Sequence, residues 1–190
     1  MSQPLFTVFT PTFNRAATLP RVYESLKEQT FGDFEWLIVD DGSTDQTSNL
    51  VADWVNERSL DIRYVAQKNA GKHVCANVAT QMARGRYIAT LDSDDWYVST
   101  ALETFARIWA SIAPRDYNNF SGVVGLCATP SGSLIGTPFP QHVLDTTYLE
   151  VIDTFNLSSD LVYLAIFQLR LSFSFQTRFR DNELNPLVPV

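Results

Sequence analysis

The hydrophobic pattern of this chain alternates between two spacings over its first two thirds. Short runs rich in β-branched and aromatic residues are typical of buried β-strands. The stretches between them place apolar residues three and four positions apart, which is the spacing of one face of an α-helix. The predicted strands cover residues 5–10, 34–41, 61–66, 86–91 and 121–129.

Four amphipathic helices are predicted between these strands. Thr18 suits the N-cap of the first helix, and Ser43 or Thr44 suits the N-cap of the second. The third helix is expected over residues 71–82 and the fourth over about 99–113. The residues expected to face the core are Leu19, Val22, Tyr23, Leu26, Leu50, Val51, Trp54, Val55, Val74, Val78, Met82, Leu102, Phe105, Ala106 and Trp109.

The order of these elements predicts an α/β fold. Strands and helices alternate with short connections, which favours right-handed βαβ units around a mostly parallel sheet flanked by helices. Ligands bind such sheets beyond the carboxyl ends of the strands. Polar clusters follow the first, second and fourth strands, at residues 10–15, 40–43 and 92–95. We therefore expect all three clusters at one edge of the sheet.

Three carboxylates, Asp92, Asp94 and Asp95, directly follow the fourth predicted strand. Like charges this close raise each other's pKa, and a cation among them removes that cost. Carboxylate oxygens are ligands of Mg²⁺ or Mn²⁺, and such an ion can also bind a diphosphate. The simpler alternative is that Asp94 or Asp95 caps the next helix.

The other two clusters offer groups that recognise a nucleotide. A carboxylate of Asp40 or Asp41 can accept a hydrogen bond from a base N–H or a sugar hydroxyl, although a plain turn is an equal alternative. Gly42 permits that turn to be tight, and Asn14 and Arg15 offer donors beside it.

Gly71 and Lys72 open the third predicted helix, and helix N-termini favour anions. His73, next to them, is more simply interpreted as a surface residue. Trp54 and Trp109 are predicted in the core. The places of Trp36 and Trp96 stay open, the latter because it adjoins the acidic cluster.

Composition narrows these hypotheses. The 190 residues, 45% hydrophobic and 18% charged, suit one globular domain, and the net charge of −7 argues against a nucleic-acid partner. Cys75 and Cys127 lack metal-ligand spacing and are interpreted as reduced thiols, with a disulfide as the alternative. No signal peptide or transmembrane segment is expected, so we expect a cytoplasmic location and leave peripheral membrane association open.

Residues 5–130 resemble family 2 glycosyltransferases, which have the GT-A fold. The resemblance rests on the joint spacing of PTFNR, VDDGSTD, NAGKHVCAN and the acidic LDSDDW. It implies a nucleotide-sugar-binding GT-A core over residues 1–130. Residues 131–190 would then be an acceptor-side or truncated segment of the same domain.

The resemblance also implies roles for individual residues. In that family the residues after the first two strands contact the base and ribose, and the DXD region binds the ribose side and the metal. Asp94, with Asp92, would hold Mn²⁺ or Mg²⁺. The residues expected to bind the nucleotide are Thr10, Pro11, Thr12, Asn14, Arg15, Asp40, Asp41, Gly71, Lys72, Asp92 and Ser93.

The reaction implied is transfer of a sugar, with inversion, from a nucleotide sugar to an acceptor hydroxyl. The donor is expected to be a UDP-sugar. The acceptor is expected to be a sugar, glycan or lipid-linked molecule, as in synthesis of cell-surface polysaccharide. The catalytic base would be Asp181 or Glu183, with Asp153 and Asp160 as weaker candidates.

Two other classes of protein are alternatives. A non-catalytic remnant of the same family, with a truncated acceptor side, would still bind nucleotide sugars. A phosphotransfer protein is disfavoured, because a receiver domain or haloacid-type phosphatase needs its acidic residues after the first strand, where this chain has TPTFN.

Overall fold

The computed structural model describes residues 3–120 and 122–135, and beyond them the backbone of four short strands. Its first half alternates strand and helix: β1 (Phe6–Thr12), α1 (Leu19–Lys27), β2 (Phe34–Asp40), α2 (Thr47–Glu57), β3 (Ile62–Ala66), α3 (Lys72–Met82), β4 (Tyr87–Thr90) and α4 (Ala101–Ser111). A 3-10 helix (Pro114–Asn119) and short strands follow: β5 (Gly122–Val123), β6 (Cys127–Ala128), β7 (Asp145–Thr147), β8 (Phe167–Gln168), β9 (Gln176–Arg178) and β10 (Val188–Pro189).

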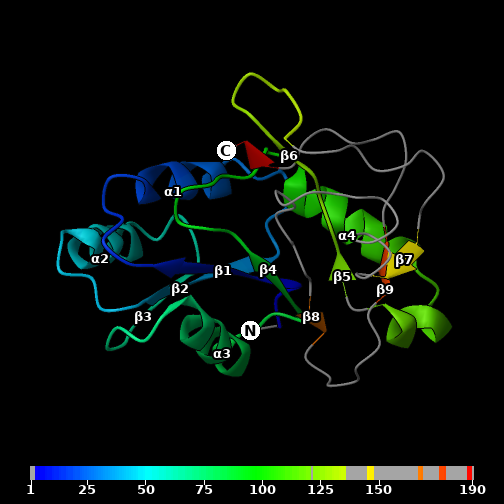
Figure 1. Cartoon of the computed structure of the whole chain (residues 1–190), viewed down its shortest axis with the longest axis horizontal. Coiled ribbons are helices and arrows are strands. Elements are labelled where there is room, and N and C mark those ends of the chain that lie inside the picture. The colour runs from blue at the N-terminus through cyan, green and yellow to red at the C-terminus, as the bar shows by residue number, and fades with distance from the viewer. Residues whose placement is uncertain are drawn as a thin grey trace.

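A five-stranded sheet in the order β3-β2-β1-β4-β8 forms the centre of the molecule (Figure 1). β1 pairs in parallel with β2 and with β4, and β2 pairs in parallel with β3. β8 is antiparallel to β4 at the edge. The remaining short strands pair as β5-β9-β7 and as β10-β6.

Two hydrophobic clusters lie on opposite faces of this sheet. The larger one joins α1, α2 and α4 to residues such as Val8 and Trp36, and the smaller one joins α3 to Phe9 and Leu37. Neighbouring residues of β1 thus point to opposite faces, as the pleat of a strand requires. In Figure 1, α1 and α4 lie above the sheet and α3 lies below it.

The structure confirms the predicted α/β fold, with a parallel β3-β2-β1-β4 sheet flanked by helices. The predicted core tryptophans Trp54 and Trp109 are buried, and so is Trp36, which the sequence left open. Trp54 stacks on Tyr23 with ring centroids 4.4 Å apart. Cys75 and Cys127 are buried thiols, not a disulfide.

Two predictions about local structure are wrong. The second helix has Gln46 as its N-cap, not Ser43 or Thr44. The Ser43 hydroxyl instead accepts from the backbone N–H of Asn14 at 2.8 Å, and the N–H of Thr47 at the start of α2 donates to Asp45 Oδ1 at 2.9 Å. Residues 121–129 do not form one strand, because β5 pairs with β9 whereas β6 pairs with β10.

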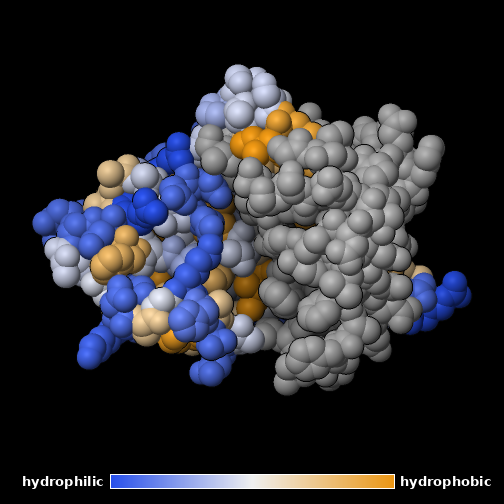
Figure 2. Space-filling view, viewed as in Figure 1, coloured by the Kyte–Doolittle hydropathy of each residue, from blue (hydrophilic) through white to orange (hydrophobic). Residues whose placement is uncertain are grey.

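The described surface is mostly hydrophilic on the face shown in Figure 2, especially over α2 and the loops beside it. Of the described large hydrophobic residues, Phe13, Val55 and Leu134 are exposed, so the prediction that Val55 faces the core is wrong. Among the helices that the structure describes, none is long and apolar enough to cross a membrane.

Candidate active site

The three polar clusters lie at the same edge of the sheet. Parallel pairing places Thr12 beside Asp40, and Asp40 beside Ala66. The backbone N–H of Leu91 donates to Phe9 at 2.9 Å, so the acidic cluster begins level with the end of β1. This carboxyl edge is the position at which parallel sheets bind ligands.

Asn14 joins the loop after β1 to the loop after β2. Its Oδ1 accepts hydrogen bonds from the backbone N–H of Thr44 at 2.8 Å and of Asp45 at 3.3 Å. In return, its own N–H donates to Ser43 Oγ at 2.8 Å. Asn14 has a φ of 53°, a left-handed conformation that asparagine tolerates better than most residues. Its amide oxygen is therefore used to hold the two loops together.

Asp40 ends β2 and is buried. Its Oδ1 accepts from the backbone N–H of Ser43 at 2.7 Å, and its Oδ2 accepts from the hydroxyl of Tyr64. Burial, and then this neighbouring carboxylate, raise the pKa of the Tyr64 phenol well above its usual range. Both carboxylate oxygens thus have partners within the protein.

Asp41 anchors the loop that leads into α3. Its oxygens accept from Gln67 Nε2 at 2.7 Å, from the N–H of Ala70 at 2.9 Å and from the N–H of Gly71 at 2.7 Å. Burial alone would raise the pKa of Asp41, but these hydrogen bonds outweigh it and lower the pKa. Asp41 is buried, and its role in the site is to hold this loop in place.

Gly42 sits between this loop and the turn after β2 with a φ of 86°. A Cβ there would lie 3.0 Å from the backbone nitrogen of Asn69. The glycine is therefore needed for both conformation and close approach.

The carboxylates of the acidic cluster are held less completely. Asp92 Oδ2 pairs with Lys72 Nζ at 2.6 Å, whereas its Oδ1 is buried and has no hydrogen-bond partner. Asp94 Oδ2 pairs with a guanidinium nitrogen of Arg15 at 3.2 Å. All four of these side chains are between one third and two thirds exposed.

Asp95 lies deeper than its two neighbours, at 8% exposed. Burial, followed by the charges of Asp92 and Asp94, raises the pKa of Asp95 to about 6, against the opposing effect of Arg21 and Lys72. The concentration of negative charge seen in the sequence is therefore a real electrostatic cost in the folded chain.

The other predicted nucleotide-binding residues have mixed positions. Thr10 is buried, and its Oγ1 accepts from Trp36 Nε1 at 2.9 Å in the core. Pro11, Thr12 and Ser93 are also buried, and the Thr12 hydroxyl has no hydrogen-bond partner. The candidate bases Asp181 and Glu183, and the weaker candidates Asp153 and Asp160, lie outside the described residues.

Two residues at this edge, Phe13 and Arg21, were not singled out in the sequence, and Trp96 was left open there. Phe13 directly follows β1 and is 46% exposed, which is unusual for a phenylalanine. Arg21 contacts Trp96, the residue that follows the acidic cluster, with the guanidinium 3.9 Å from the ring centroid. Phe13 could have been noticed as an aromatic residue within a polar loop. The contact between Arg21 and Trp96 could not, because the two residues are far apart in the sequence.

The carboxylates of Asp92 and Asp94 fit a hard divalent cation by their chemistry, and Asp92 Oδ1 is an oxygen that lacks a partner. Among the described residues, however, no group of three or more histidine, cysteine, aspartate or glutamate side chains is arranged to hold a metal. A cation here would therefore complete its coordination with ligand or water oxygens.

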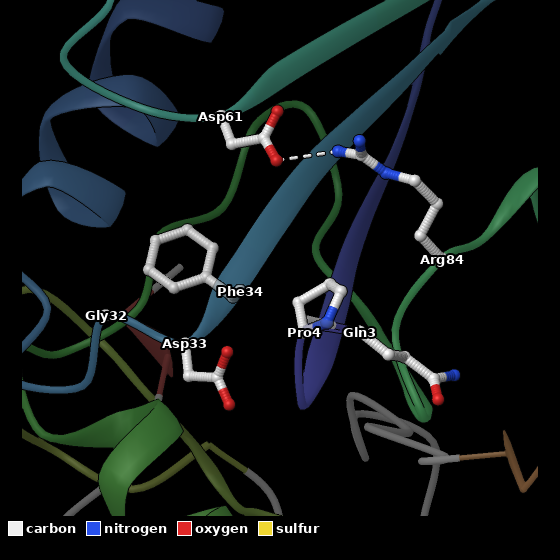
Figure 3. A pocket seen from close by; sticks show the side chains of 7 residues that line it. All are labelled: Gln3, Pro4, Gly32, Asp33, Phe34, Asp61 and Arg84. Carbon is white, nitrogen blue, oxygen red and sulfur yellow. Dashed lines mark hydrogen bonds and ion pairs between the residues drawn. The ribbon is translucent and has the colours of Figure 1, made fainter. Parts of the chain in front are cut away.

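A hollow of about 580 Å³ lies at the opposite edge of the sheet, where the strands begin (Figure 3). Pro4, Asp33, Asp61 and Arg84, which line it, precede β1, β2, β3 and β4. Asp61 and Arg84 pair with each other at 2.6 Å across it. It is separate from the acidic cluster.

The fold is that of GT-A transferases. TarS of S. aureus (residues 1–349), solved with UDP-GlcNAc, matches with a TM-score of 0.56 and 27% identity, over 75% of this chain and 38% of that one. The mannosyltransferase PcManGT from Pyrobaculum calidifontis, solved with GDP-Man and Mn²⁺, matches with a TM-score of 0.56 and 25% identity, over 68% of this chain and 36% of that one.

The chain belongs to glycosyl transferase family 2, whose profile matches residues 7–114. A chondroitin synthase from Escherichia coli is 37% identical over 53% of this chain and 14% of its own length. A PGL/p-HBAD biosynthesis glycosyltransferase from Mycobacterium bovis is 35% identical over 61% of this chain and 44% of its own length. The chain thus spans less than half of these relatives.

Proposed function

We propose that this chain binds a nucleotide sugar at the carboxyl edge of its sheet and transfers the sugar, with inversion, to an acceptor hydroxyl. A single observation carries the proposal. The acidic cluster holds two carboxylates in exposed ion pairs, and one carboxylate oxygen, Asp92 Oδ1, is buried without a partner. Binding a cation together with an anion lowers the electrostatic energy of a charge arrangement of this kind.

Mn²⁺ or Mg²⁺, held by Asp94 and Asp92, would stabilise the charge that develops on the leaving diphosphate. The chain's own residues would do the rest of the donor binding. Lys72 and Arg15 carry long, exposed side chains that reach the cluster from α3 and from the loop after β1. Once displaced from the carboxylates, both can donate to phosphate oxygens.

The base of the nucleotide has a candidate platform in Phe13, whose exposed ring stands after β1. Stacking on an aromatic ring holds a base without reading its identity. Asp40 and Asp41 are proposed to support the base-binding loops, since their oxygens already accept hydrogen bonds within the protein. A direct contact from either carboxylate to a base N–H would require one of these bonds to exchange.

The donor is proposed to be a UDP-sugar, with a GDP-sugar as the alternative. TarS is described with UDP-GlcNAc and PcManGT with GDP-Man, so the two solved structures contain different nucleotides. Calorimetric titration of the chain with UDP, GDP and their sugars, with and without Mn²⁺, decides between them. Failure of every nucleotide to bind in the presence of Mn²⁺ would refute the proposal.

The metal assignment has its own test. Mn²⁺ should tighten UDP binding to the wild-type chain and have little effect on Asp94→Asn, because the carboxylate that holds the ion is gone. Asp53→Asn is a matched control, since Asp53 is an exposed aspartate on α2, away from the acidic cluster. Equal metal dependence in wild type and Asp94→Asn would contradict the assignment.

Catalysis is separable from donor binding. We propose that Asp181 or Glu183 takes the proton of the acceptor hydroxyl. Transfer of radiolabelled sugar to a panel of sugar acceptors should then be lost in Asp181→Asn or in Glu183→Gln, with UDP binding kept. If the wild-type chain binds UDP and Mn²⁺ but transfers nothing, the second candidate holds, that of a donor-binding remnant.

A further inference from the structure

Helix α1 carries a row of polar side chains on the face that meets the acidic cluster. Thr18, at its N-cap, is followed by Arg21, Ser25 and Gln29, at spacings of three and four residues. This spacing places Thr18, Arg21 and Ser25 on one side of the helix, and Gln29 follows in the turn just beyond the C-cap, Glu28. None of the four was among the expected functional residues.

The first and last side chains of this row contact the backbone near the two ends of residues 92–98, which we call the acidic segment. Thr18 Oγ1 donates to the backbone carbonyl of Ser93 at 2.8 Å. Gln29 Nε2 donates to the backbone carbonyl of Val98 at 2.9 Å. The ladder of β4 ends at Thr90, so these contacts take over from the sheet in fixing the backbone.

The middle of the row contacts the middle of the segment. Ser25 Oγ accepts from the backbone N–H of Tyr97 at 3.4 Å. Arg21 donates from its guanidinium to the backbone carbonyl of Asp94. The guanidinium also lies over the ring of Trp96, 3.9 Å from its centroid.

All these contacts reach the backbone of the segment or the Trp96 ring, and none reaches a carboxylate. The helix therefore fixes where Asp92 and Asp94 stand and leaves their oxygens available. Arg21 acts on the residue that matters most, since it holds the carbonyl of Asp94 and the ring two residues further along. A planar guanidinium can do both at once, and an ammonium group cannot.

We propose that Arg21 is a positioning residue of this site: with Trp96 it aims the Asp94 carboxylate at the divalent cation that accompanies the nucleotide. This rests on the proposed function. It differs from a ligand-binding role, because Arg21 would act through Asp94 without touching metal or phosphate. Residues that orient a metal ligand commonly change metal affinity by about 10-fold or more when they are removed.

The test is calorimetric titration of UDP into the full chain, with and without Mn²⁺, for wild type and Arg21→Met. UDP binding without metal should stay unchanged, whereas the tightening caused by Mn²⁺ should shrink about 10-fold. Arg21→Lys keeps the charge and loses the stacking plane, so its loss should be smaller, about 3-fold. A general loss of fold would weaken both titrations together and would show in the circular dichroism spectrum.

Arg86→Met provides the matched control. Arg86 is also an exposed arginine beside aromatic rings, 5.2 Å from the centroid of Tyr87 and 5.5 Å from that of Tyr117. It precedes β4, at the opposite edge of the sheet. Its substitution should leave the Mn²⁺ effect on UDP binding at the wild-type value.

Three results would overturn the proposal. The first is that Mn²⁺ tightens UDP binding as much in Arg21→Met as in wild type, and the second is that Arg86→Met weakens this effect as much as Arg21→Met does. The third is a wild-type Mn²⁺ effect on UDP binding in a folded Arg21→Met, Trp96→Leu double variant. We expect the double variant to lose no more of the Mn²⁺ effect on UDP binding than the more damaging single substitution, because the two side chains act as one unit. Absence of any Mn²⁺ effect in the wild-type chain would instead refute the proposed metal site, so the two failures are distinguishable.

Discussion

Two buried carboxylates, one at each edge of the sheet, show how differently this fold treats negative charge. Glu35, at the beginning of β2, is 0% exposed and accepts from Thr7 Oγ1 at 2.6 Å, from the Arg84 backbone at 2.6 Å and Nε at 2.5 Å, and from Arg63 at 3.2 Å. Burial alone would raise the pKa of Glu35, but these hydrogen bonds outweigh it and lower the pKa.

Asp95, at the carboxyl edge, is buried almost as deeply, and yet its pKa is raised to about 6. Burial is the main cause, and the charges of Asp92 and Asp94 add to it. The difference lies in the surroundings: Glu35 is surrounded by donors, whereas Asp95 has two acids for neighbours. Removing a buried charge that is fully paired leaves its partners uncompensated, whereas a charge that is poorly compensated within the fold is available for a ligand.

The largest expected effect is on Glu35. In Glu35→Gln the buried counter-charge of Arg63 and Arg84 is removed and Arg84 keeps only its pair with Asp61, so the free energy of unfolding should fall by about 3 kcal/mol. Urea unfolding followed by tryptophan fluorescence measures it. Asp53→Asn, an exposed substitution of the same chemistry, should change the stability by less than about 0.5 kcal/mol. A loss of stability of similar size in both variants would mean that the buried Glu35 contributes no more than an exposed acid.

The acid side of the stability profile gives a second test of Glu35. Because its folded pKa lies below the ordinary value of 4.5, its contribution to stability is complete above that pH. The contribution is lost as the pH falls through the lower, folded pKa. The wild-type free energy of unfolding should therefore decline below about pH 4.5. The decline should be shallower in Glu35→Gln, and parallel profiles would contradict the assignment.

Gly85 tests the closeness of packing at the same edge. A Cβ at this position would lie 2.3 Å from the backbone nitrogen of Thr7, which cannot move without disturbing β1. Gly85→Ala should therefore cost about 2 kcal/mol of stability by overpacking. Gly32→Ala is the control, because nothing lies within 4 Å of the added methyl. Thermal unfolding of the two variants should show a clear difference, and equal midpoints would refute the steric argument.

Asp95 should respond in the opposite direction from Glu35. Asp95→Asn removes a buried charge from beside two other acids, so the metal-free chain should gain about 1 kcal/mol of stability. Urea unfolding in a buffer with chelator measures this gain. A stability gain at a ligand site is the usual sign that function was favoured over stability. A loss as large as that of Glu35→Gln would mean that both carboxylates are structural.

The sequence predicted the sheet well because strand and helix periods are local properties. It also placed the acidic cluster correctly, since parallel topology brings the ends of all strands to one edge. It could not distinguish the two kinds of carboxylate. Asp41 looks like a ligand residue in VDDGSTD, and its hydrogen-bond partners lie 26 to 30 residues further along the chain.

Glu35 shows the same limit from the other side. In the sequence it is one polar residue in an apolar strand, and its partners Arg63 and Arg84 come from two later elements. Arg21 and Trp96 likewise meet only because α1 packs along the acidic cluster. Contacts of this kind depend on the tertiary arrangement of rigid elements, and no local pattern reports them.

The smallest expected effect concerns Lys72, whose amine stands 2.6 Å from Asp92 Oδ2. A divalent cation bound at Asp92 repels this ammonium group, so Lys72 opposes metal binding when no nucleotide is present. Lys72→Gln should therefore bind Mn²⁺ alone somewhat more tightly, by about 2- to 5-fold, the strength of an exposed ion pair. Electron paramagnetic resonance of unbound Mn²⁺ measures the affinity directly.

The same substitution should weaken binding of UDP together with Mn²⁺, because the displaced amine would no longer reach the diphosphate. Opposite signs for metal alone and for metal with nucleotide are the signature of a side chain that exchanges partners. Lys68→Gln removes an equal charge from the loop that precedes α3, at an exposed lysine, and should produce neither change. If Lys68→Gln tightened Mn²⁺ binding as much as Lys72→Gln, the effect would be general electrostatics, and the carboxyl edge would hold its charges no more specifically than any exposed surface does.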